Sequence, residues 1–262
     1  MTQLPVSVFI ITLNEQTHMR RLLPQLQRFK EVVIVDSGSS DATEEVARCF
    51  ANVRFHRRTW SGFGDQKQYA LSLCQQPWLL NLDADEEMTP DFLLEIETAV
   101  DRDDCDAVTC QRILLRWGRR PRSVQAEQLV RFFRRGHGVY SEAKVHERLL
   151  VTGRVINVKA ALLHHENLSF SQRVQKSNQY SQLKAEDKFS RGQRCRVLHL
   201  LLVFPVAFLQ CYFGKRCLLD GVDGSVTSMH VAYYQFMKYA KLRELQQRQV
   251  QSVAESPEYS PG

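Results

Sequence analysis

Two aspartates, Asp83 and Asp85, lie two positions apart directly after the apolar run Trp78 to Leu82. Carboxylates at this spacing can approach one divalent cation, and Mg²⁺ and Mn²⁺ prefer oxygen ligands that they share with phosphates. A cation held there stabilises the charge that builds on a diphosphate as its bond to carbon breaks. Acidic pairs after strands are more often solvated turns, so Asp83-Ala84-Asp85 gains weight only from the rest of the chain.

Two further polar segments follow apolar runs earlier in the chain. Thr12, Asn14 and Glu15 can hydrogen-bond a nucleotide, and Asp36 can accept hydrogen bonds from a base or a ribose. Gly38 allows a close approach of the backbone to such a ligand. A helix-capping turn explains each segment equally well by itself. The three segments together, in order and within one half of the chain, favour a nucleotide site.

The elements that must position these segments follow from the hydrophobic pattern. Apolar and β-branched runs predict strands, and apolar residues at helical spacing predict helices between them. We expect strands at 6–12, 31–35, 53–55, 78–82 and 107–115, and helices at 14–29, 42–50, 66–74 and 91–100. Strands alternating with helices indicate an α/β fold with a mostly parallel sheet flanked by helices, whose ligands bind at the carboxyl ends of strands.

The second half of the chain has a different pattern. We expect a strand-rich continuation to residue 168, a helical extension over 169–245, and a disordered Gln-, Ser- and Pro-rich tail over 246–262. Within the extension, Val197 to Gly214 carries no formal charge and is only marginally long for a bilayer span. An interfacial or core helix is preferred there over a spanning one.

Composition narrows the class of protein and its partners. The formal charge of +6 favours anionic partners. The odd set of seven cysteines contains no CxxC pair, which argues against a disulfide framework or a zinc ribbon and indicates a reducing, cytoplasmic compartment. The N-terminus lacks the pattern of a secretory signal. The basic stretch at 116–135 lacks interleaved aromatic residues, so we expect no nucleic-acid partner.

The polar segments, taken as a set, resemble the family 2 glycosyltransferases, which share the GT-A fold. The resemblance covers roughly residues 4 to 100 and rests on Thr12–Glu15, Val35–Thr43 and Leu82–Glu86. It implies that Glu15 and Asp36 hold the nucleoside, and that Asp83-Ala84-Asp85 lies at the metal and the diphosphate. Lys67 is in a segment similar to the family's helix facing the nucleotide, where it would meet a phosphate. A surface lysine is the alternative.

Within that family, Lys144-Val145-His146-Glu147-Arg148 resembles the Val-His-Glu motif of the bacterial lipopolysaccharide inner-core β-glucosyltransferases. The resemblance implies that Glu147 is the base that deprotonates the acceptor hydroxyl; Glu142 is a competitor, and a structural ion pair is the alternative role for Glu147. His164 is a candidate third ligand of the metal. Because adjacent strand residues point to opposite faces, at most one of His164 and His165 can serve.

The resemblance implies an inverting, metal-dependent transferase that uses Mg²⁺ or Mn²⁺ and moves glucose from UDP-glucose to a heptose of the lipopolysaccharide inner core. We expect a nucleotide-sugar donor, a glycolipid acceptor and peripheral contact with the cytoplasmic face of the inner membrane. Basic residues in 112–135 and the apolar segment 197–213 suit an acceptor with anionic sugars on a lipid anchor. A polyprenyl-phosphate or peptide acceptor, or a non-catalytic nucleotide-binding module, remain as alternatives.

Overall fold

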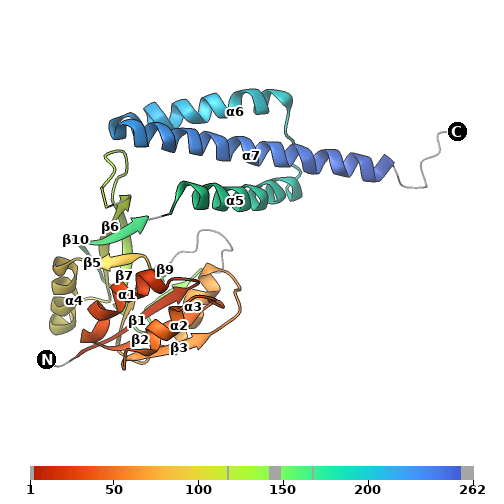
Figure 1. The fold of residues 1–262 in the computed structure, drawn as a ribbon. Helices are drawn as coiled ribbons and strands as arrows, with labels where there is room; N and C mark the ends of the chain where they lie inside the picture. Colours follow the sequence, from red (N-terminus) through yellow and green to blue (C-terminus); the bar gives the residue numbers. More distant parts are fainter. Residues whose placement is uncertain (1–2, 117, 142–148, 167, 255–262) are drawn as a thin grey trace. The chain divides into compact units, whose positions relative to one another are not determined.

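The computed structural model describes residues 3–116, 118–141, 149–166 and 168–254 (Figure 1). Contacts between residues divide the chain into two compact units. The first comprises Met1–Arg120 and Ala126–Glu166, and the second comprises Pro121–Gln125 and Asn167–Gly262. Residues 121–125, which the sequence-based division assigns to the first domain, therefore pack with the second unit.

The first unit is built on an eight-stranded mixed sheet with the strand order β3-β2-β1-β4-β7-β6-β10-β5. A second sheet pairs β8 with β9. The strands are β1 (Leu4–Thr12), β2 (Phe29–Asp36), β3 (Val53–Arg57), β4 (Trp78–Asn81), β5 (Glu86–Met88), β6 (Ala107–Arg116), β7 (Glu127–Arg134), β8 (Gly138–Tyr140), β9 (Leu149–Val151) and β10 (Val155–Glu166). The helices of this unit are α1 (Gln16–Leu22), η1 (Leu23–Arg28), α2 (Thr43–Arg48), α3 (Phe63–Leu73) and α4 (Pro90–Arg102).

The four neighbouring strands β3, β2, β1 and β4 run parallel to one another. In this register Thr12 of β1 is opposite Asp36 of β2, and Phe9 of β1 is opposite Asn81 of β4. The carboxyl ends of these strands therefore meet at one edge of the sheet, as the sequence predicts for the three polar segments. The expected class, a mostly parallel sheet flanked by helices, is confirmed.

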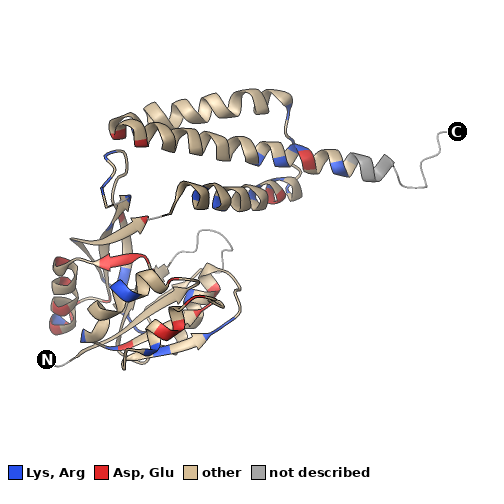
Figure 2. Ribbon diagram, in the orientation of Figure 1, with Lys and Arg blue, Asp and Glu red and all other residues tan. Residues whose placement is uncertain are grey.

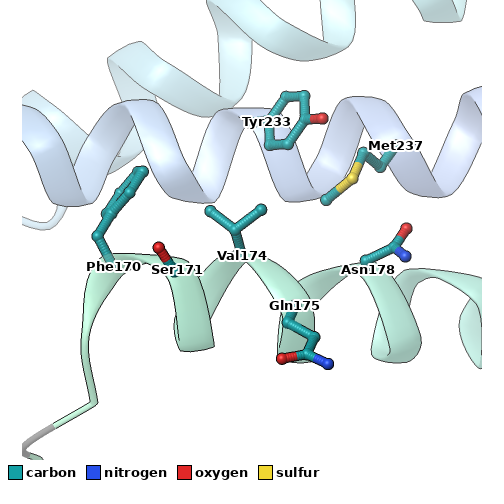
Figure 3. Close-up of a pocket in the computed structure, with 7 residues that line it drawn as sticks. All are labelled: Phe170, Ser171, Val174, Gln175, Asn178, Tyr233 and Met237. Atoms are coloured by element: carbon teal, nitrogen blue, oxygen red, sulfur yellow. The ribbon is translucent and has the colours of Figure 1, made fainter.

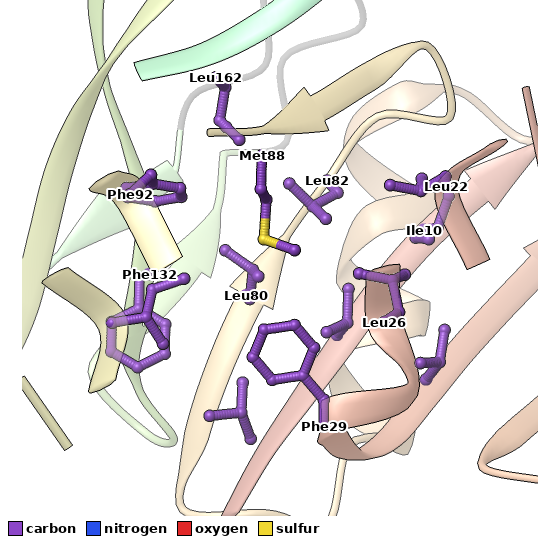
Figure 4. Packing of buried hydrophobic residues seen from close by; sticks show 14 of the residues in the cluster. Ile10, Leu22, Leu26, Phe29, Leu80, Leu82, Met88, Phe92, Phe132 and Leu162 are labelled. Atoms are coloured by element: carbon purple, nitrogen blue, oxygen red, sulfur yellow. The ribbon is translucent and has the colours of Figure 1, made fainter. Parts of the chain in front are cut away.

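Side chains that alternate along the central strands form one apolar layer on each face of the sheet. Val8 and Ile10 face a core that includes Met19 of α1 and Phe92 of α4, and Figure 4 shows Ile10 and Phe92 in this cluster. Phe9 faces the opposite core, which includes Ala70 of α3. All six side chains are fully buried. Both faces of the sheet are thus covered, which explains why these strands read as continuous apolar runs.

The single helix predicted over 14–29 is replaced by two shorter segments. α1 ends at Leu22, and the 3₁₀ helix η1 continues from Leu23 with Pro24 in its first turn. Proline has no N–H to donate to the preceding turn, and its ring clashes with that turn in a continuous α-helix. The apolar spacing predicted the buried face correctly, since Met19, Leu22 and Leu26 all lie in the core.

The second unit is a helical extension, as expected. It contains α5 (Phe170–Ser190), α6 (Val197–Leu209), the π-helical turn η2 (Gln210–Gly214), η3 (Cys217–Asp220) and α7 (Gly221–Ala254). α7 packs against both α5 and α6. Helix α7 extends to Ala254, so the prediction of a disordered tail is wrong for residues 246–254. The sequence from Gln246 consists of helix-compatible residues and holds no proline before Pro257.

Helices α5 and α7 border an open groove of about 400 Å³ (Figure 3). Phe170 and Val174 of α5 line it on one side, and Tyr233 and Met237 of α7 line it on the other. No lining residue carries a formal charge. The carboxylates that the sequence predicts to bind a metal and a nucleotide are instead at the sheet edge of the first unit.

Candidate active site

Asp36, the last residue of β2, is the centre of a hydrogen-bonded cradle. Its carboxylate accepts from Thr12 Oγ1 at 2.9 Å, from the Gly38 N–H at 2.9 Å and from the Ser39 N–H at 2.7 Å. Both Thr12 and Asp36 are almost completely buried. Gly38 has φ = +99°, a left-handed conformation that glycine adopts without strain. The cradle thus fixes the ends of β1 and β2 against each other.

Hydrogen bonds join the loop after β1 to the loop after β2. The Asn14 N–H donates to Ser39 Oγ at 2.7 Å, and Asn14 Oδ1 accepts from the Ser40 N–H at 2.8 Å. Asn14 has φ = +57°, which asparagine tolerates better than most residues. The Glu15 N–H donates to Thr43 Oγ1 at 2.9 Å. The structure therefore brings the predicted residues Thr12, Asn14, Asp36 and Gly38 together.

Glu15, also predicted to hold a nucleoside, keeps a partly exposed carboxylate, and its Oε2 contacts His18 Nδ1 at 2.5 Å. Glu15 is thus placed beside the cradle with its side chain available to solvent on one side. Its partner His18 lies one turn further along the chain. A ligand on this edge can compete with His18 for the carboxylate.

Asp83, the first acid of the Asp83-Ala84-Asp85 segment, lies between two cations. Its Oδ1 is 2.9 Å from Lys67 Nζ, and its Oδ2 is 2.8 Å from Arg131 Nη2. Lys67 comes from α3 and Arg131 from β7, and both are largely buried. Ala84 is buried in the first core cluster, which turns the two flanking carboxylates away from the apolar interior.

Arg131 also binds Glu86 and Asn81. Its Nη2 lies 2.5 Å from Glu86 Oε1, and its Nη1 donates to Asn81 Oδ1 at 2.6 Å. Tyr140 Oη donates to the same Asn81 oxygen at 2.9 Å. A fully buried carboxylate, Glu86, is therefore held beside the partly exposed Asp83 by one guanidinium.

The charges of this cluster shift its titration. Burial by itself raises the pKa of Asp83, but Arg131 and Lys67 outweigh burial and hold that pKa well below its usual range. Burial raises the pKa of Glu86, and the neighbouring Asp83 raises it further against the opposing effect of Arg131. Asp83 is therefore ionised at neutral pH.

Three residues of this cluster were not predicted from the sequence: Arg131, Asn81 and Tyr140. Asn81 interrupts an apolar strand, and a buried amide needs a partner, so its position was a usable signal. Arg131 is one of several basic residues between 116 and 135, so its sequence context does not distinguish it. Its pairing depends on β7 lying beside β4, a contact between residues far apart in the sequence.

Asp85, the second acid, faces His164 from β10. His164 Nδ1 lies 3.1 Å from Asp85 Oδ1, whereas His165 Nε2 lies 2.9 Å from Glu87 Oε2. Burial lowers the pKa of His164, but the hydrogen bond and charge of Asp85 raise it above its usual value. The two histidines therefore face different carboxylates, and His164 is the one beside the Asp83-Ala84-Asp85 segment.

The donor set around Asp85 fits a divalent cation in chemistry and access. Asp85 keeps a third of its side chain exposed and supplies oxygen, while His164 supplies nitrogen. In the parts of the chain that the structure describes, no group of three or more His, Cys, Asp or Glu side chains is arranged to hold a metal ion. A cation at this position would therefore need further oxygen ligands from a diphosphate and water.

Two other expectations have separate outcomes. Glu147, predicted as the base, and its competitor Glu142 lie outside the described residues.

The basic stretch expected to meet an anionic acceptor is substantially paired within the protein. Its internal pairs are Arg112 with Glu127, Arg116 with Glu166, Arg131 with Asp83 and Glu86, and Arg134 with Asp103.

Neighbouring parallel strands with carboxylates at or just after their carboxyl ends define an α/β protein with a site suited to a phosphorylated nucleotide. Comparison with known families agrees with this class, because residues 7–148 match the model of glycosyl transferase family 2. The chain belongs to this family. The predicted family is confirmed, and with it the expectation of an enzyme that transfers glycosyl groups.

Individual relatives extend the comparison beyond the matched segment. The chain is 36% identical over 249 residues to the lipopolysaccharide core biosynthesis glycosyltransferase LpsC of Rhizobium meliloti, covering 92% of each chain. Among solved structures, TarS residues 1–349 of S. aureus in complex with UDP-GlcNAc has 14% identity and a TM-score of 0.49, with 95% of this chain and 92% of that chain covered. Glucosyl-3-phosphoglycerate synthase from Mycobacterium tuberculosis, solved with Mn²⁺, UDP and glucosyl-3-phosphoglycerate, has 20% identity and a TM-score of 0.35 over 41% and 43% of the two chains.

Proposed function

We propose that this protein is an inverting glycosyltransferase of lipopolysaccharide core assembly, which transfers glucose from UDP-glucose to an inner-core heptose at the cytoplasmic face of the inner membrane. The observation that carries the proposal is the meeting of the Asp36 cradle and the Asp83-Ala84-Asp85 segment at adjacent parallel strand ends. The similarity to LpsC along nearly the whole of both chains supports the class of acceptor.

In this proposal the Asp36 cradle binds the nucleoside. The Asp36 carboxylate is already oriented by Thr12 and the backbone of Gly38, so a bound nucleoside meets a fixed acceptor group. Asn14 and Glu15 flank it from the loop after β1. Such an arrangement favours a ribose or base donor over a second anion.

Lys67 and Asp83 act on the diphosphate side of the site. Lys67 neutralises Asp83 in the nucleotide-free protein and can turn toward a phosphate oxygen when the donor binds. Asp85 and His164 would hold Mg²⁺ or Mn²⁺, which when bound neutralises charge on the leaving diphosphate. Arg131 fixes Asp83 and so positions the segment without contacting the substrate itself.

The transfer itself is a single displacement at the anomeric carbon of the donor sugar. The acceptor hydroxyl oxygen forms a bond to that carbon while the bond from carbon to the diphosphate oxygen breaks, and the configuration inverts. The hydroxyl proton passes to a carboxylate base, for which Glu147 is proposed. The nucleoside diphosphate leaves with the bonding electron pair.

A thermal-shift screen of nucleoside diphosphates and nucleotide sugars, with and without Mn²⁺, tests the proposal. We expect uridine nucleotides with Mn²⁺ to raise the Tm of the protein, because a ligand that binds the folded state stabilises it. Asp36→Asn should reduce the shift, and Asp101→Asn, on the exposed surface of α4, should not. Equal shifts in the two variants would remove Asp36 from the site.

A further inference from the structure

The second unit contains a helical segment that the fold leaves largely uncovered. Val197–Gly214, formed by α6 and η2, carries no charged residue and is by length and composition the single described segment able to cross a membrane. Only 6% of it is buried. A core helix of a soluble protein of this composition is mostly buried, so this segment requires a cover that the described residues do not provide.

The exposed apolar side chains spread widely around α6 and η2. Leu198 and Leu201 are each about two-thirds exposed, and Val206, Leu209 and Phe213 are about half exposed. At 3.6 residues per turn these positions occupy a broad arc rather than a narrow stripe. A broad apolar arc fits an extended apolar phase better than a single groove-binding helix.

The neighbouring helix α7 adds a second apolar surface. Val222, Val226, Met229, Tyr233 and Phe236 recur every three or four residues, so they line one stripe of α7, and all five are exposed. No charged residue lies between Gly224 and Met237. Figure 2 shows α6 and this part of α7 without charge, in contrast to the later part of α7.

Basic residues border the apolar segment at both ends. Arg194 and Arg196 precede it, Lys215 and Arg216 follow it, and all four are exposed. From residue 188 to residue 219 the sequence holds six basic residues and no acidic one, whereas the rest of the chain holds 29 of each. The whole formal net charge of +6 therefore resides in and around this segment.

We propose that the apolar face of α6, η2 and the first half of α7 docks in the surface of an anionic lipid bilayer, with the four bordering cations on phosphate headgroups. Apolar area and cations together are what bind interfacial helices to anionic lipid. The inference rests on the proposed function only for the identity of the membrane. It supplies the surface at which a lipid-anchored acceptor is met.

Contacts at both ends of α6 indicate that the segment lies along the membrane and does not cross it. At the turn between η3 and α7, the Asp220 carboxylate accepts from the Arg122 N–H at 2.6 Å and also binds Ser123. At the other end, the Cys195 N–H donates to Gln246 Oε1 at 3.2 Å. A spanning α6 would draw the exposed Arg122 through the hydrocarbon layer, which is strongly unfavourable.

The bordering charges also disfavour a second copy of the chain as the cover. A two-fold symmetric pair along α6 brings basic ends near basic ends, and residues 188–219 offer no carboxylate to compensate. Like charges in a contact oppose association. Lipid phosphates provide the complementary charge.

The test is flotation of the full-length protein with vesicles of phosphatidylcholine alone or with an equal amount of phosphatidylglycerol. We expect binding to the anionic vesicles that weakens as salt is added. The double variant Leu198→Glu and Leu201→Glu should lose at least about tenfold in partitioning, because two charges replace inserted apolar side chains. Leu94→Glu, an equally exposed leucine of α4, is the matched control and should bind as the unmodified protein does.

Several results would overturn the proposal. These are no binding to anionic vesicles, equal binding by the double variant, retention in the bilayer after alkaline extraction, and a dimer in sedimentation velocity that the double variant dissociates. Titration of UDP-glucose without vesicles separates this proposal from the enzymatic one. A double variant that keeps nucleotide affinity while losing vesicle binding supports docking, and vesicle binding without any nucleotide affinity would contradict the proposed function alone.

Discussion

Arg131 Nη2 lies 2.8 Å from Asp83 Oδ2, so the first acid of the Asp83-Ala84-Asp85 segment is held by a buried guanidinium on another strand. The same nitrogen binds Glu86, which has no exposed surface. Arg131 therefore holds the acidic segment in place before any ligand binds. A site that is preorganised in this way needs little rearrangement when charge develops.

Removing this guanidinium should be costly. Arg131→Gln leaves buried Glu86 without its cation, and breaking a buried pair destabilises by about 3–5 kcal/mol. Urea unfolding followed by circular dichroism measures the effect. Arg112→Gln breaks an exposed pair with Glu127 and should change the free energy of unfolding by less than about 1 kcal/mol. Similar losses in the two variants would show that Arg131 has no special structural role.

The loop after β2 should depend on glycine at position 38. Gly38 has φ = +99° with no neighbouring atom within 4 Å of an added Cβ, so Gly38→Ala tests backbone strain and not packing. We expect a loss of about 1–2 kcal/mol of stability together with weaker nucleotide binding. Gly214→Ala also meets open space but has a helical backbone, and it should be neutral or slightly stabilising. Equal effects on stability would contradict the strain argument.

His164 and His165 form a natural pair for testing the metal site. His164→Ala should weaken the Mn²⁺-dependent rise in Tm because it removes a donor beside Asp85, and His165→Ala should not because His165 faces Glu87. The measurement is a thermal-shift titration with Mn²⁺ and a uridine nucleotide. A response to His165→Ala alone would assign the ligand to the other face of β10.

The acid stability of the first unit should depend on Glu31. Burial opposes its ionisation, but Ser7, the Gln75 N–H at 2.8 Å and Arg54 stabilise the carboxylate and lower its pKa. A lowered pKa in the folded state gives stability that is present above the unfolded pKa of about 4.3 and is lost as pH falls.

Glu31→Gln should therefore flatten the fall in unfolding free energy below about pH 5 by up to about 1.4 kcal/mol per pH unit, the equivalent of one proton. Urea unfolding at a series of pH values gives this slope. Glu97, whose pair with Arg28 is partly exposed, provides the control Glu97→Gln. An unchanged slope in Glu31→Gln would show that the Glu31 carboxylate is equally stabilised in the unfolded chain.

The sequence predicted β1 to β4 and β6 and the helices between them, because each of the central strands among them is a continuous apolar run bounded by polar residues; it did not predict β5 or β7. It also placed Thr12, Asp36 and Asp83 at strand ends, since the carboxyl ends of parallel strands share an edge. Local patterns carried these predictions. The helix expected over 14–29 is broken near Pro24, and this proline was the sequence signal for the break.

The partners of the acidic residues were beyond reach of local patterns. Arg131 meets Asp83 only because the antiparallel strand β7 inserts between β4 and β6. Similarly, the Asp220 carboxylate binds the backbone of Arg122, nearly a hundred positions earlier in the sequence. Such contacts depend on tertiary structure, and nothing in the spacing of either segment encodes them.

Glucosyl transfer is tested by incubating the protein with UDP-glucose, Mn²⁺ and a heptose-containing inner-core acceptor, and measuring the product by mass spectrometry. We expect an acceptor heavier by one hexose, formed by the unmodified protein and by Asp101→Asn. Asp85→Asn should lose at least about a hundredfold in rate, comparable to removing one preorganised electrostatic group. Full activity in Asp85→Asn would contradict the assignment of the Asp83-Ala84-Asp85 segment to the donor diphosphate.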